Sequence, residues 1–467
     1  MKSSRLLILA VLVIALGAWI YFVERKMPTT EEARQQADKV LPKLDRDQVT
    51  GLKITNPHGT FQLEKKDGSW RLVKPIEGPA DQGAVGALLG QLVNLKAERT
   101  FGKGEVDPKA YGLDKPPMRV VLTTKDGTRF TLDVGEKTAL GSNRAVTRGD
   151  GKILLCAGWF ANDLGKDLDA WRSHSVADVS PSKVASLDIR AGSDHIKVVR
   201  DGRVWRLLDP IKDLADRRQV EDLITDINGM RIKEFLDAKA DLAKLGLDHP
   251  ERTVTIVRTD GAKPVELEFG TTREVKGAKQ VACRRNGKDL FWVDDKGQIR
   301  LGKAPVLWRS PVLYPFDSWD VDRMEIAAGG TTIKLDRTGG TWKLADGSEA
   351  NGGEVLSRLS KLSQMKATDF DLVDTKTPEI GRITLVLSPD DTAGKDKAKA
   401  EGPTITFVFR RPFAKKGDKA EVTVSARDTV MGVPLDEAEA LFRNLDALRK
   451  PKATPTPKAT PAPTATK

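Results

Sequence analysis

Hydrophobic and polar residues alternate along much of the chain, and the same alternation returns in three places. When the sequence is aligned on Trp70, Trp205 and Trp342, the 22 residues ending at each tryptophan match without an insertion. The apolar residues of these segments recur at steps of two, which is the spacing of a strand with one buried face. Asp-Gly or Gly-Gly pairs precede each tryptophan, and glycine permits the positive φ of a hairpin turn. The pattern predicts a three-stranded antiparallel meander at each place.

A helix is predicted after each meander. Pro75 and Pro210 close the last strand, and Asp81 and Asp216 follow them as N-cap residues. Apolar residues then recur at helical spacing, so each helix carries one apolar stripe that can cover a face of a sheet. The predicted stripes are Val85, Leu88, Leu89, Leu92 and Leu95; Val220, Leu223, Ile224, Ile227 and Met230; and Val355, Leu356, Leu359, Leu362 and Met365.

A second group of strands is predicted after the helix in the first two copies. Gly112 and Gly246 each begin a Gly-Leu-Asp motif, and alternating strands flank an Asp-Gly pair that starts 14 residues further on. Trp171 and Trp308 begin the Trp-Arg-Ser motifs that end these copies. The third copy lacks the Gly-Leu-Asp motif and carries a polar insertion at residues 388–402, as expected at the end of a repeat array.

A membrane anchor is predicted at the N-terminus. Leu6 to Val23 is a run of 18 residues without a charge, about 27 Å of helix and long enough to cross a bilayer core. Basic residues precede the run, which favours a cytoplasmic N-terminus and a periplasmic location for the rest of the chain. A cleaved signal peptide is the alternative, because small residues at 15–17 resemble a cleavage site. The apolar run continues beyond them, so we favour an uncleaved anchor in the inner membrane.

The sequence therefore predicts an α+β fold in which an N-terminal transmembrane helix is followed by three tandem repeats. Each repeat is an antiparallel β-meander with one covering helix plus a second β-rich submodule. The predicted parts are a membrane anchor at 1–26, a linker at 27–48, repeat 1 at 49–177, repeat 2 at 178–315, a divergent repeat 3 at 316–450 and a disordered Pro/Ala/Thr/Lys tail at 451–467.

Composition and charge narrow the classes of protein that fit. With 39% hydrophobic residues among 467, the chain is too apolar for general disorder and too polar for a polytopic membrane protein. The net charge of +11 suggests a nucleic-acid partner, yet residues 51–450 hold 66 basic and 60 acidic residues, an excess of only 6. These charges alternate in sign and do not cluster with aromatic residues, so we expect a mixed-charge surface and no nucleic-acid binding.

The residues that carry chemistry are sparse. The four histidines are at least 21 positions apart, and no metal-binding, nucleophile or phosphate-loop motif occurs. The sequence therefore predicts no catalytic residues, no metal site, no cofactor and no enzymatic activity. Cys156 and Cys283 do not fall at equivalent repeat positions, which favours two small buried residues over a disulfide.

The tryptophan residues form two groups, which suggest different roles. Trp70, Trp205, Trp342, Trp171 and Trp308 recur at a fixed register, which indicates packing, and we group them with Gly112 and Gly246 as structural residues of the repeat signature. Trp159, Trp292 and Trp319 have no such place, and exposed aromatic residues would suit a glycan ligand.

The chain resembles a bacterial family called domain of unknown function 4340. The resemblance rests on the anchor, the strand–turn–Trp-x-Leu pattern, the Pro-Ala-Asp-Gln stretch at 79–82, the leucine-rich helix, Tyr-Gly-Leu-Asp at 111–114, and Trp-Arg-Ser before Tyr-Pro-Phe-Asp at 314–317. It covers roughly residues 1–380 and is weakest in the third copy. The family has no established activity. Its members are often encoded beside a gliding-motility-type ABC transporter permease and its auxiliary subunit, which implies an accessory role in the cell envelope.

The resulting expectation is a non-enzymatic, membrane-anchored periplasmic repeat protein that acts as a scaffold or accessory subunit of an envelope ABC-transporter-type complex. Its expected partners are the inner membrane, through one helix, and envelope proteins such as a permease or auxiliary subunit. A cell-wall or polysaccharide-binding module and an unrecognised periplasmic hydrolase are the alternatives.

Overall fold

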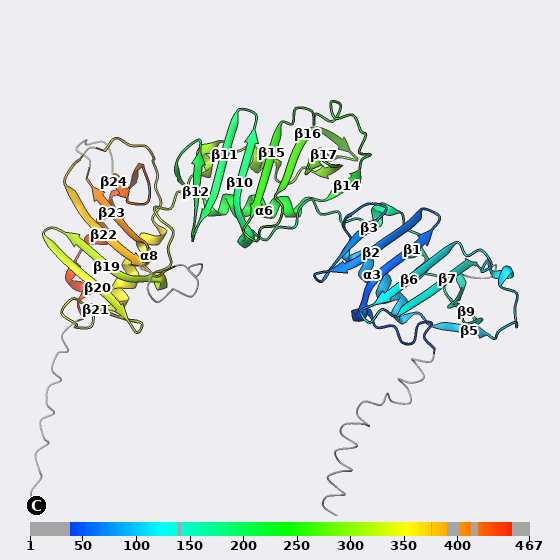
Figure 1. Ribbon diagram of the computed structural model, residues 1–467. Coiled ribbons are helices and arrows are strands. Elements are labelled where there is room, and N and C mark those ends of the chain that lie inside the picture. The colour runs from blue at the N-terminus through cyan, green and yellow to red at the C-terminus, as the bar shows by residue number, and fades with distance from the viewer. Residues whose placement is uncertain (1–37, 139–141, 375, 390–401, 412–418, 451–467) are drawn as a thin grey trace, which may run out of the picture. The chain divides into compact units, whose positions relative to one another are not determined.

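The computed structural model describes residues 38–138, 142–374, 376–389, 402–411 and 419–450 (Figure 1). These residues form two compact units, one ending at His174 and one beginning at Ser175. The fold is mostly antiparallel sheet with few helices: one sheet lies in the first unit and two lie in the second. The predicted anchor from Leu6 to Val23 and the tail at 451–467 lie outside the described residues. No helix among the described residues is long and apolar enough to cross a membrane.

The first sheet has nine strands in the order β4-β3-β2-β1-β6-β7-β8-β9-β5. Its strands are β1 (Val49–Asn56), β2 (Gly59–Lys66), β3 (Ser69–Lys74), β4 (Gly78–Pro79), β5 (Ala97–Phe101), β6 (Met118–Thr124), β7 (Arg129–Lys137), β8 (Asn143–Thr147) and β9 (Ile153–Ala157). Helices α3 (Gln82–Asn94), α4 (Phe160–Leu164) and α5 (Leu168–Trp171) belong to the same unit.

The second sheet also has nine strands, in the order β13-β12-β11-β10-β15-β16-β17-β18-β14. They are β10 (Val184–Ala191), β11 (Asp194–Asp201), β12 (Val204–Asp209), β13 (Asp213–Leu214), β14 (Ile232–Phe235), β15 (Arg252–Arg258), β16 (Val265–Val275), β17 (Ala278–Arg285) and β18 (Asp289–Asp294). Helices α6 (Arg217–Gly229) and α7 (Gln298–Leu301) accompany them.

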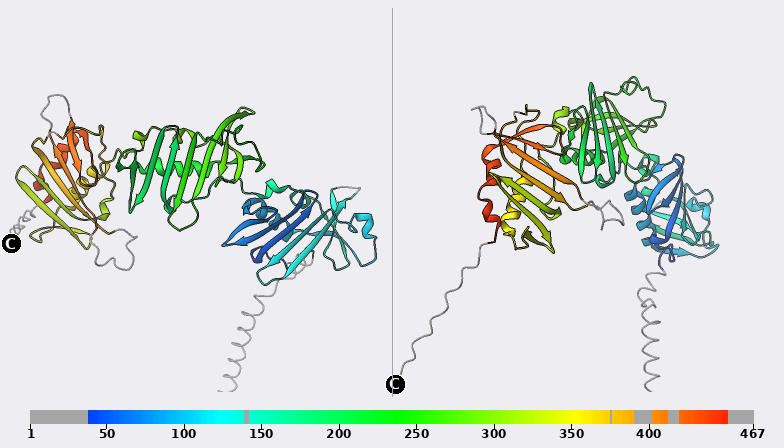
Figure 2. Two further views of the ribbon diagram at one scale, coloured as in Figure 1. Left: turned by 45° about the horizontal axis from the view of Figure 1, so that its top comes forward. Right: turned by 60° about the vertical axis from the view of Figure 1, so that its left-hand side comes forward.

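The third sheet has seven strands among the described residues, in the order β21-β20-β19-β22-β23-β24-β25. They are β19 (Val321–Ala328), β20 (Thr331–Thr338), β21 (Thr341–Leu344), β22 (Glu379–Leu387), β23 (Thr404–Arg410), β24 (Lys419–Val424) and β25 (Val430–Pro434). Helices α8 (Gly352–Gln364) and α9 (Leu435–Phe442) complete this part. In all three sheets a meander is followed by a helix that packs on one face (Figures 1 and 2).

The predicted meanders and helices are present. Asp81 caps α3, because its carboxylate accepts a hydrogen bond from the Ala84 backbone N–H at 2.8 Å. Asp216 caps α6 in the same way through the Arg218 N–H at 2.9 Å. Asn351 is the corresponding cap of α8 and was not predicted. Each cap satisfies an N–H group that the first turn of a helix leaves without a partner.

The predicted second submodule is not a separate layer. β6 pairs directly with β1, with Leu52 opposite Leu122 and Ile54 opposite Val120, and β15 pairs with β10 at the same place in the second sheet. The first strand of a meander exposes a row of unpaired backbone N–H and C=O groups. Pairing with the strand that follows the helix satisfies these groups, so each meander and its later strands form one continuous sheet.

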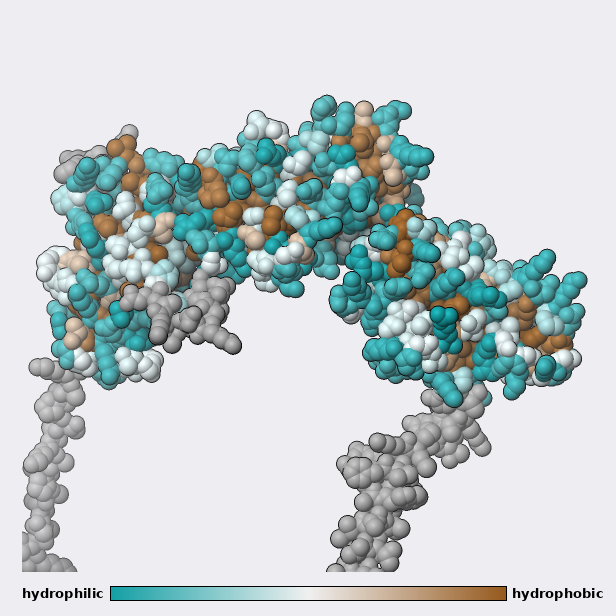
Figure 3. Space-filling model, in the orientation of Figure 1, coloured by the Kyte–Doolittle hydropathy of each residue, from teal (hydrophilic) through white to brown (hydrophobic). Residues whose placement is uncertain are grey.

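The five repeat-signature tryptophans are buried. Their exposed fractions lie between 0 and 6%, and each belongs to one of the hydrophobic cores. Of the three tryptophans without a repeat position, Trp292 is buried at 7%, whereas Trp159 and Trp319 are 47% and 67% exposed. The prediction for Leu356 was wrong: it was placed in the buried stripe of α8 and is 47% exposed. The face drawn in Figure 3 is mainly hydrophilic, with small hydrophobic patches between the charged residues.

Both cysteines are free and buried, which confirms their interpretation as small core residues. Burial raises the pKa of the Cys156 thiol to about 12. Burial also raises the pKa of the Cys283 thiol. Both side chains are therefore neutral thiols at physiological pH and poor nucleophiles.

Gly246 is expected to tolerate no side chain. Its φ is +63°, and a Cβ there would lie 2.9 Å from the Cγ2 atom of Thr271 and 3.1 Å from the Thr271 backbone nitrogen. Gly261 has a similar φ of +71° with open space around it, and it serves as the matched control. We expect Gly246→Ala to lower the free energy of unfolding by about 2–3 kcal/mol and Gly261→Ala by about 1 kcal/mol. Denaturant unfolding of both variants tests this, and equal losses would contradict the steric argument.

Candidate functional site: a buried ion-pair cluster in the second unit

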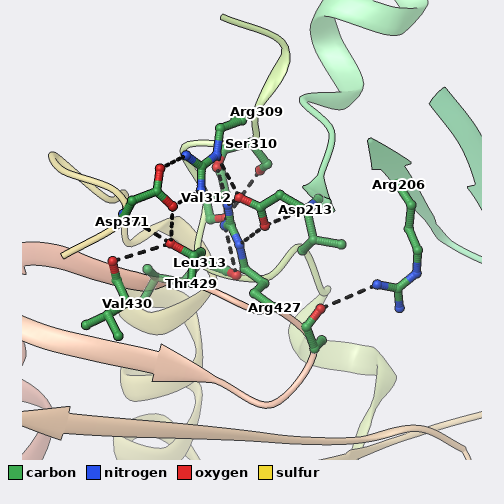
Figure 4. Close-up of polar contacts among 12 residues, drawn as sticks. Arg206, Asp213, Arg309, Ser310, Val312, Leu313, Asp371, Arg427, Thr429 and Val430 are labelled. Atoms are coloured by element: carbon green, nitrogen blue, oxygen red, sulfur yellow. Dashed lines mark hydrogen bonds and ion pairs between the residues drawn. The ribbon is translucent and has the colours of Figure 1, made fainter. Parts of the chain in front are cut away.

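Four charged side chains meet inside the second unit (Figure 4). Asp213 lies on β13, and Arg309 follows the short 3₁₀ helix η5 (Pro305–Trp308). Asp371 lies between α8 and β22, and Arg427 lies in the turn between β24 and β25. The first two residues belong to the second sheet and its flanking loop, and the other two belong to the third. The cluster therefore joins two parts of the chain that are more than 60 residues apart.

Asp213 is the centre of the cluster. Its carboxylate is completely buried, with 0% of the side chain exposed. One oxygen, Oδ2, accepts hydrogen bonds from Arg309 Nε at 2.9 Å and Arg427 Nη2 at 2.8 Å. The other oxygen, Oδ1, accepts from Arg427 Nε at 2.7 Å and from the Leu214 backbone N–H at 2.7 Å. Four hydrogen bonds, three of them from cationic groups, thus satisfy both oxygens of this carboxylate.

Arg427 is also completely buried, with 0% of its side chain exposed. Besides its two bonds to Asp213, it donates to the backbone carbonyl groups of Ser310, Val312 and Leu313 at distances of 3.1, 2.8 and 3.3 Å. These carbonyl groups belong to the segment that connects the second sheet to the third. The Arg427 side chain therefore ties the turn of the third sheet to that segment and to Asp213 at once.

Arg309 connects Asp213 to the edge of the cluster. Its Nη1 and Nη2 atoms donate to the two carboxylate oxygens of Asp371 at 2.6 and 3.1 Å. The Thr429 hydroxyl donates to the same carboxylate at 3.0 Å. The ring of Phe370 lies 4.3 Å from the Arg309 guanidinium and 5.6 Å from that of Arg427, where cation–π attraction adds to the ion pairs.

The charges of the cluster balance. Two carboxylates, the buried Asp213 and the largely exposed Asp371, face two buried guanidinium groups, so the cluster as a whole is neutral. A buried ion is costly unless its partner and its hydrogen bonds are all in place, and here they are. The Arg309 guanidinium, which donates to both carboxylate oxygens, holds the pKa of Asp371 below its ordinary value against the opposing effect of burial.

The lowered pKa of Asp371 predicts a loss of stability in acid. A carboxylate with a depressed pKa in the folded state stabilises the fold above its unfolded pKa of about 3.9, and that contribution is lost as the pH falls through the folded value. The free energy of unfolding of the second unit should therefore fall less steeply below about pH 4 in Asp371→Asn than in the wild-type chain. Urea unfolding between pH 5 and pH 2.5 measures both curves. Parallel curves would show that Asp371 is not linked to folding.

Apolar and polar contacts outside the cluster also join the second and third sheets. Val204 of β12 and Leu214 of the edge strand β13 belong to the same hydrophobic core as the buried residues of the third sheet. Arg203 forms an ion pair with Asp320 at 2.5 Å, and Arg206 donates to the Ala426 carbonyl at 3.4 Å. The second and third sheets thus share a core, with the ion-pair cluster at its side.

None of the four members of this cluster was predicted to be a site residue. Arg309 lies in the predicted Trp-Arg-Ser junction, but its partners are distant in sequence. Counted from Trp70 and Trp205, the position of Asp213 corresponds to Gly78 in the first sheet. A charged residue that replaces glycine beside a buried strand is a signal that could have identified Asp213. Nothing local marks Asp371 or Arg427.

The other titratable candidates are dispersed. His195 lies between Asp188, at 3.1 Å, and Asp209 on the surface of the second sheet. The other histidines, His58, His174 and His249, lie elsewhere along the chain. Within the described ranges, no group of three or more His, Cys, Asp or Glu side chains is placed to hold a metal ion.

Comparison with known proteins gives one family match. The family model described as "Domain of unknown function (DUF4340)" matches residues 70–241 and 205–381. The comparison with curated proteins gave no match. Among solved structures, the chain matches a candidate DNA polymerase III beta subunit from Eubacterium rectale with 9% identity and a TM-score of 0.16, over 85% of this chain and 93% of that one. A similarity this low carries no argument about fold or function.

Proposed function

Because the chain belongs to the DUF4340 family, which it matches over most of residues 70–381, we propose that it is a non-enzymatic scaffold or accessory subunit of an envelope complex that contains an ABC-type transporter. The family description names no activity, so the proposal rests on the architecture, on the ion-pair cluster and on the transporter genes that often accompany the family. The partners to expect are the transporter permease and its auxiliary subunit.

We infer that the three sheets are copies of one unit. The two family matches begin at Trp70 and Trp205, the anchors of the sequence alignment. The same backbone hydrogen bond occurs near the end of each copy. The backbone N–H of the residue that caps the helix donates to the backbone carbonyl of Trp171, Trp308 or Leu448. Leu448-Arg449 thus takes the place of Trp-Arg in the third copy. Arrays of this kind present extended faces to protein partners.

The buried ion-pair cluster is the observation that carries the proposal. Every charged group in it is bonded within the protein, and its centre is inaccessible to a ligand. An arrangement of this kind fixes one sheet against the next and keeps Asp213, Arg309 and Arg427 out of contact with solvent. A rigid pair of sheets suits a protein whose task is to hold other proteins at a set spacing.

The proposed location of the protein rests on the uncharged N-terminal run of the sequence. We propose that residues 1–26 anchor the chain in the inner membrane and that the rest is periplasmic. The protein should stay in the membrane fraction after a carbonate wash, and protease added to spheroplasts should digest all but a short N-terminal stub. A soluble form that begins at Ala18 would instead support a cleaved signal peptide.

Co-purification after mild crosslinking tests the function. We expect the wild-type chain to retain a transporter permease or its auxiliary subunit. Asp213→Asn should weaken this retention because it loosens the joint between two sheets. The double variant Asp213→Leu/Arg427→Met should keep it, because an apolar pair of similar size can replace a buried ion pair.

Two outcomes would contradict the proposal. If the wild-type chain retained no envelope protein, the proposed scaffold function would be wrong. Loss of the biological function in a folded, membrane-attached double variant would mean that the charges themselves are needed, which would favour an enzyme. The polysaccharide alternative is weakened because Trp292, one of its three candidate aromatic residues, is buried.

A further inference from the structure

Two large apolar side chains are exposed beside each other on the third sheet. Trp319 lies in the 3₁₀ helix η6 (Ser318–Asp320) and is 67% exposed, and Leu356 lies in the second turn of α8 and is 47% exposed. Both line a hollow of about 510 Å³. The buried Trp342 and Ala350 also line this hollow, and Arg337 and Glu349 add a charge of each sign.

The apolar residues of this hollow are peculiar to the third copy. Counted from the first valine of each meander, Trp319 corresponds to Asp47 and Ser182. Counted from each helix cap, Leu356 corresponds to Gly86 and Glu221. Two exposed positions that are polar or lack a side chain in the other copies are therefore apolar in this one. An exposed apolar pair that occurs in one copy alone indicates that another segment or molecule binds over it in that copy.

The described part of the chain ends at the wall of the hollow. Arg449 forms a β-bridge with Ala350, and the Lys450 ammonium donates to the Glu349 carboxylate at 2.8 Å. The next residues, 451–467, read PKATPTPKATPAPTATK and contain five prolines, at 451, 455, 457, 461 and 463. Such a composition favours the extended polyproline II conformation. The copy with the apolar hollow is thus the copy that leads into the proline-rich segment.

We propose that this hollow binds the chain's own proline-rich segment, residues 451–467, as a polyproline II strand with proline rings packed on Trp319 and Leu356. Aromatic-lined grooves recognise such segments because proline rings are apolar and the stiff backbone loses little entropy on binding. At about 3.1 Å per residue, Pro455 and Pro457 can lie roughly 15–22 Å from Lys450 along the segment, close enough to fold back over the hollow. This inference does not depend on the transporter partner.

The covalent link makes the interaction effective even when it is weak. A short tether gives an effective concentration of about 1 mM, so an intrinsic dissociation constant of about 0.3 mM would fill the hollow roughly three-quarters of the time. The expected effect is a loss of solvent access at Trp319 of about fourfold, since only the unfilled quarter remains reactive. Trp159 belongs to the first unit, is not among the residues that line this hollow, and is itself 47% exposed, so it reports the unprotected reactivity.

Hydroxyl-radical footprinting of the full chain tests the proposal. The oxidation of Trp319 relative to Trp159 is compared in three chains: the wild type, a chain that ends at Lys450, and a chain whose five prolines in 451–467 are replaced by serine. We expect the ratio to rise about fourfold in the truncated chain and nearly as much in the proline-free chain, which keeps the length and charge of the segment. Protection of buried Trp205 in all three chains verifies that the fold is intact.

Three results would overturn the proposal. An unchanged ratio in the truncated chain would show that the segment does not cover Trp319. A ratio that rises on truncation but not on proline replacement would show that the tether shields the surface without recognition of proline. Protection that requires added cell-wall fragments and persists without residues 451–467 would assign the hollow to a glycan.

Discussion

Asp213→Asn is expected to lower the free energy of unfolding of the second unit by about 3–5 kcal/mol, although it changes the size of the side chain hardly at all. The substitution removes the carboxylate to which Arg427 donates through Nε and Nη2, and it turns one acceptor into an amide that donates toward guanidinium N–H groups. Arg427 would then be a buried cation that has lost its hydrogen-bonded counter-ion. Arg309 would keep Asp371, so the loss is centred on Arg427.

Native-state hydrogen exchange is the suitable measurement, since a chain with two compact units need not unfold in one step. Peptides from β13, β24 and β25 should lose protection together in Asp213→Asn, and peptides from the first unit should not change. Asp371→Asn is the matched control, because 66% of that side chain is exposed and its loss should cost about 1 kcal/mol or less.

A second control separates charge from packing. Asp213→Leu/Arg427→Met removes both charges and fills the space with apolar groups, and it should restore most of the lost protection. If the single and double variants were equally unstable, the shape of the joint and not its charge balance would be decisive. If Asp213→Asn were as stable as the wild type, the cluster would contribute nothing to holding the two sheets.

The local parts of the fold could be predicted because they have local signals. Alternation at steps of two predicted β1 to β3 and their counterparts, and the Asp81 and Asp216 caps predicted where α3 and α6 begin. The pairing of β1 with β6 could not be predicted in this way, because three further strands, helix α3 and β5 lie between them in the sequence. Which edge a later strand joins depends on backbone groups that are brought together only when the sheet forms.

The ion-pair cluster shows the same limit for the site. Arg309 lies in a recognisable motif that predicted only the end of a repeat, and Asp213 and Arg427 are 214 positions apart. Charge type alone cannot select such a pair from 77 basic and 66 acidic residues. The prediction for Leu356 was wrong for a related reason. Its helical spacing fits the buried stripe of α8, but its side chain lines the surface hollow beside Trp319.

Trp205→Ala is expected to cost about 3–5 kcal/mol of the free energy of unfolding of the second unit. Trp205 is only 2% exposed and lies in one hydrophobic core with Leu223 and Ile227 of α6, as its fixed place in the alignment predicts. Removing the indole leaves a cavity between the edge of the meander and the helix, and the surrounding backbone can close it only in part. Arg200, whose guanidinium lies 5.0 Å from the indole ring, would lose its aromatic partner as well.

Trp205→Phe distinguishes packing from polar contact. Among the described residues, the Trp205 indole N–H has no hydrogen-bond acceptor, so phenylalanine keeps most of the buried ring area and removes a buried donor without a partner. We expect Trp205→Phe to cost about 1–2 kcal/mol, well below the cost of the alanine variant.

The exposed Trp319 provides a control. Trp319→Ala, at a position 67% exposed, should change the free energy of unfolding by less than about 1 kcal/mol. Hydrogen exchange in β12 and α6 measures the two Trp205 variants, and hydrogen exchange in β19 and α8 measures Trp319→Ala. A cost below about 1 kcal/mol for Trp205→Ala would contradict the packing role of the whole tryptophan set, because the same register was used to assign each of them.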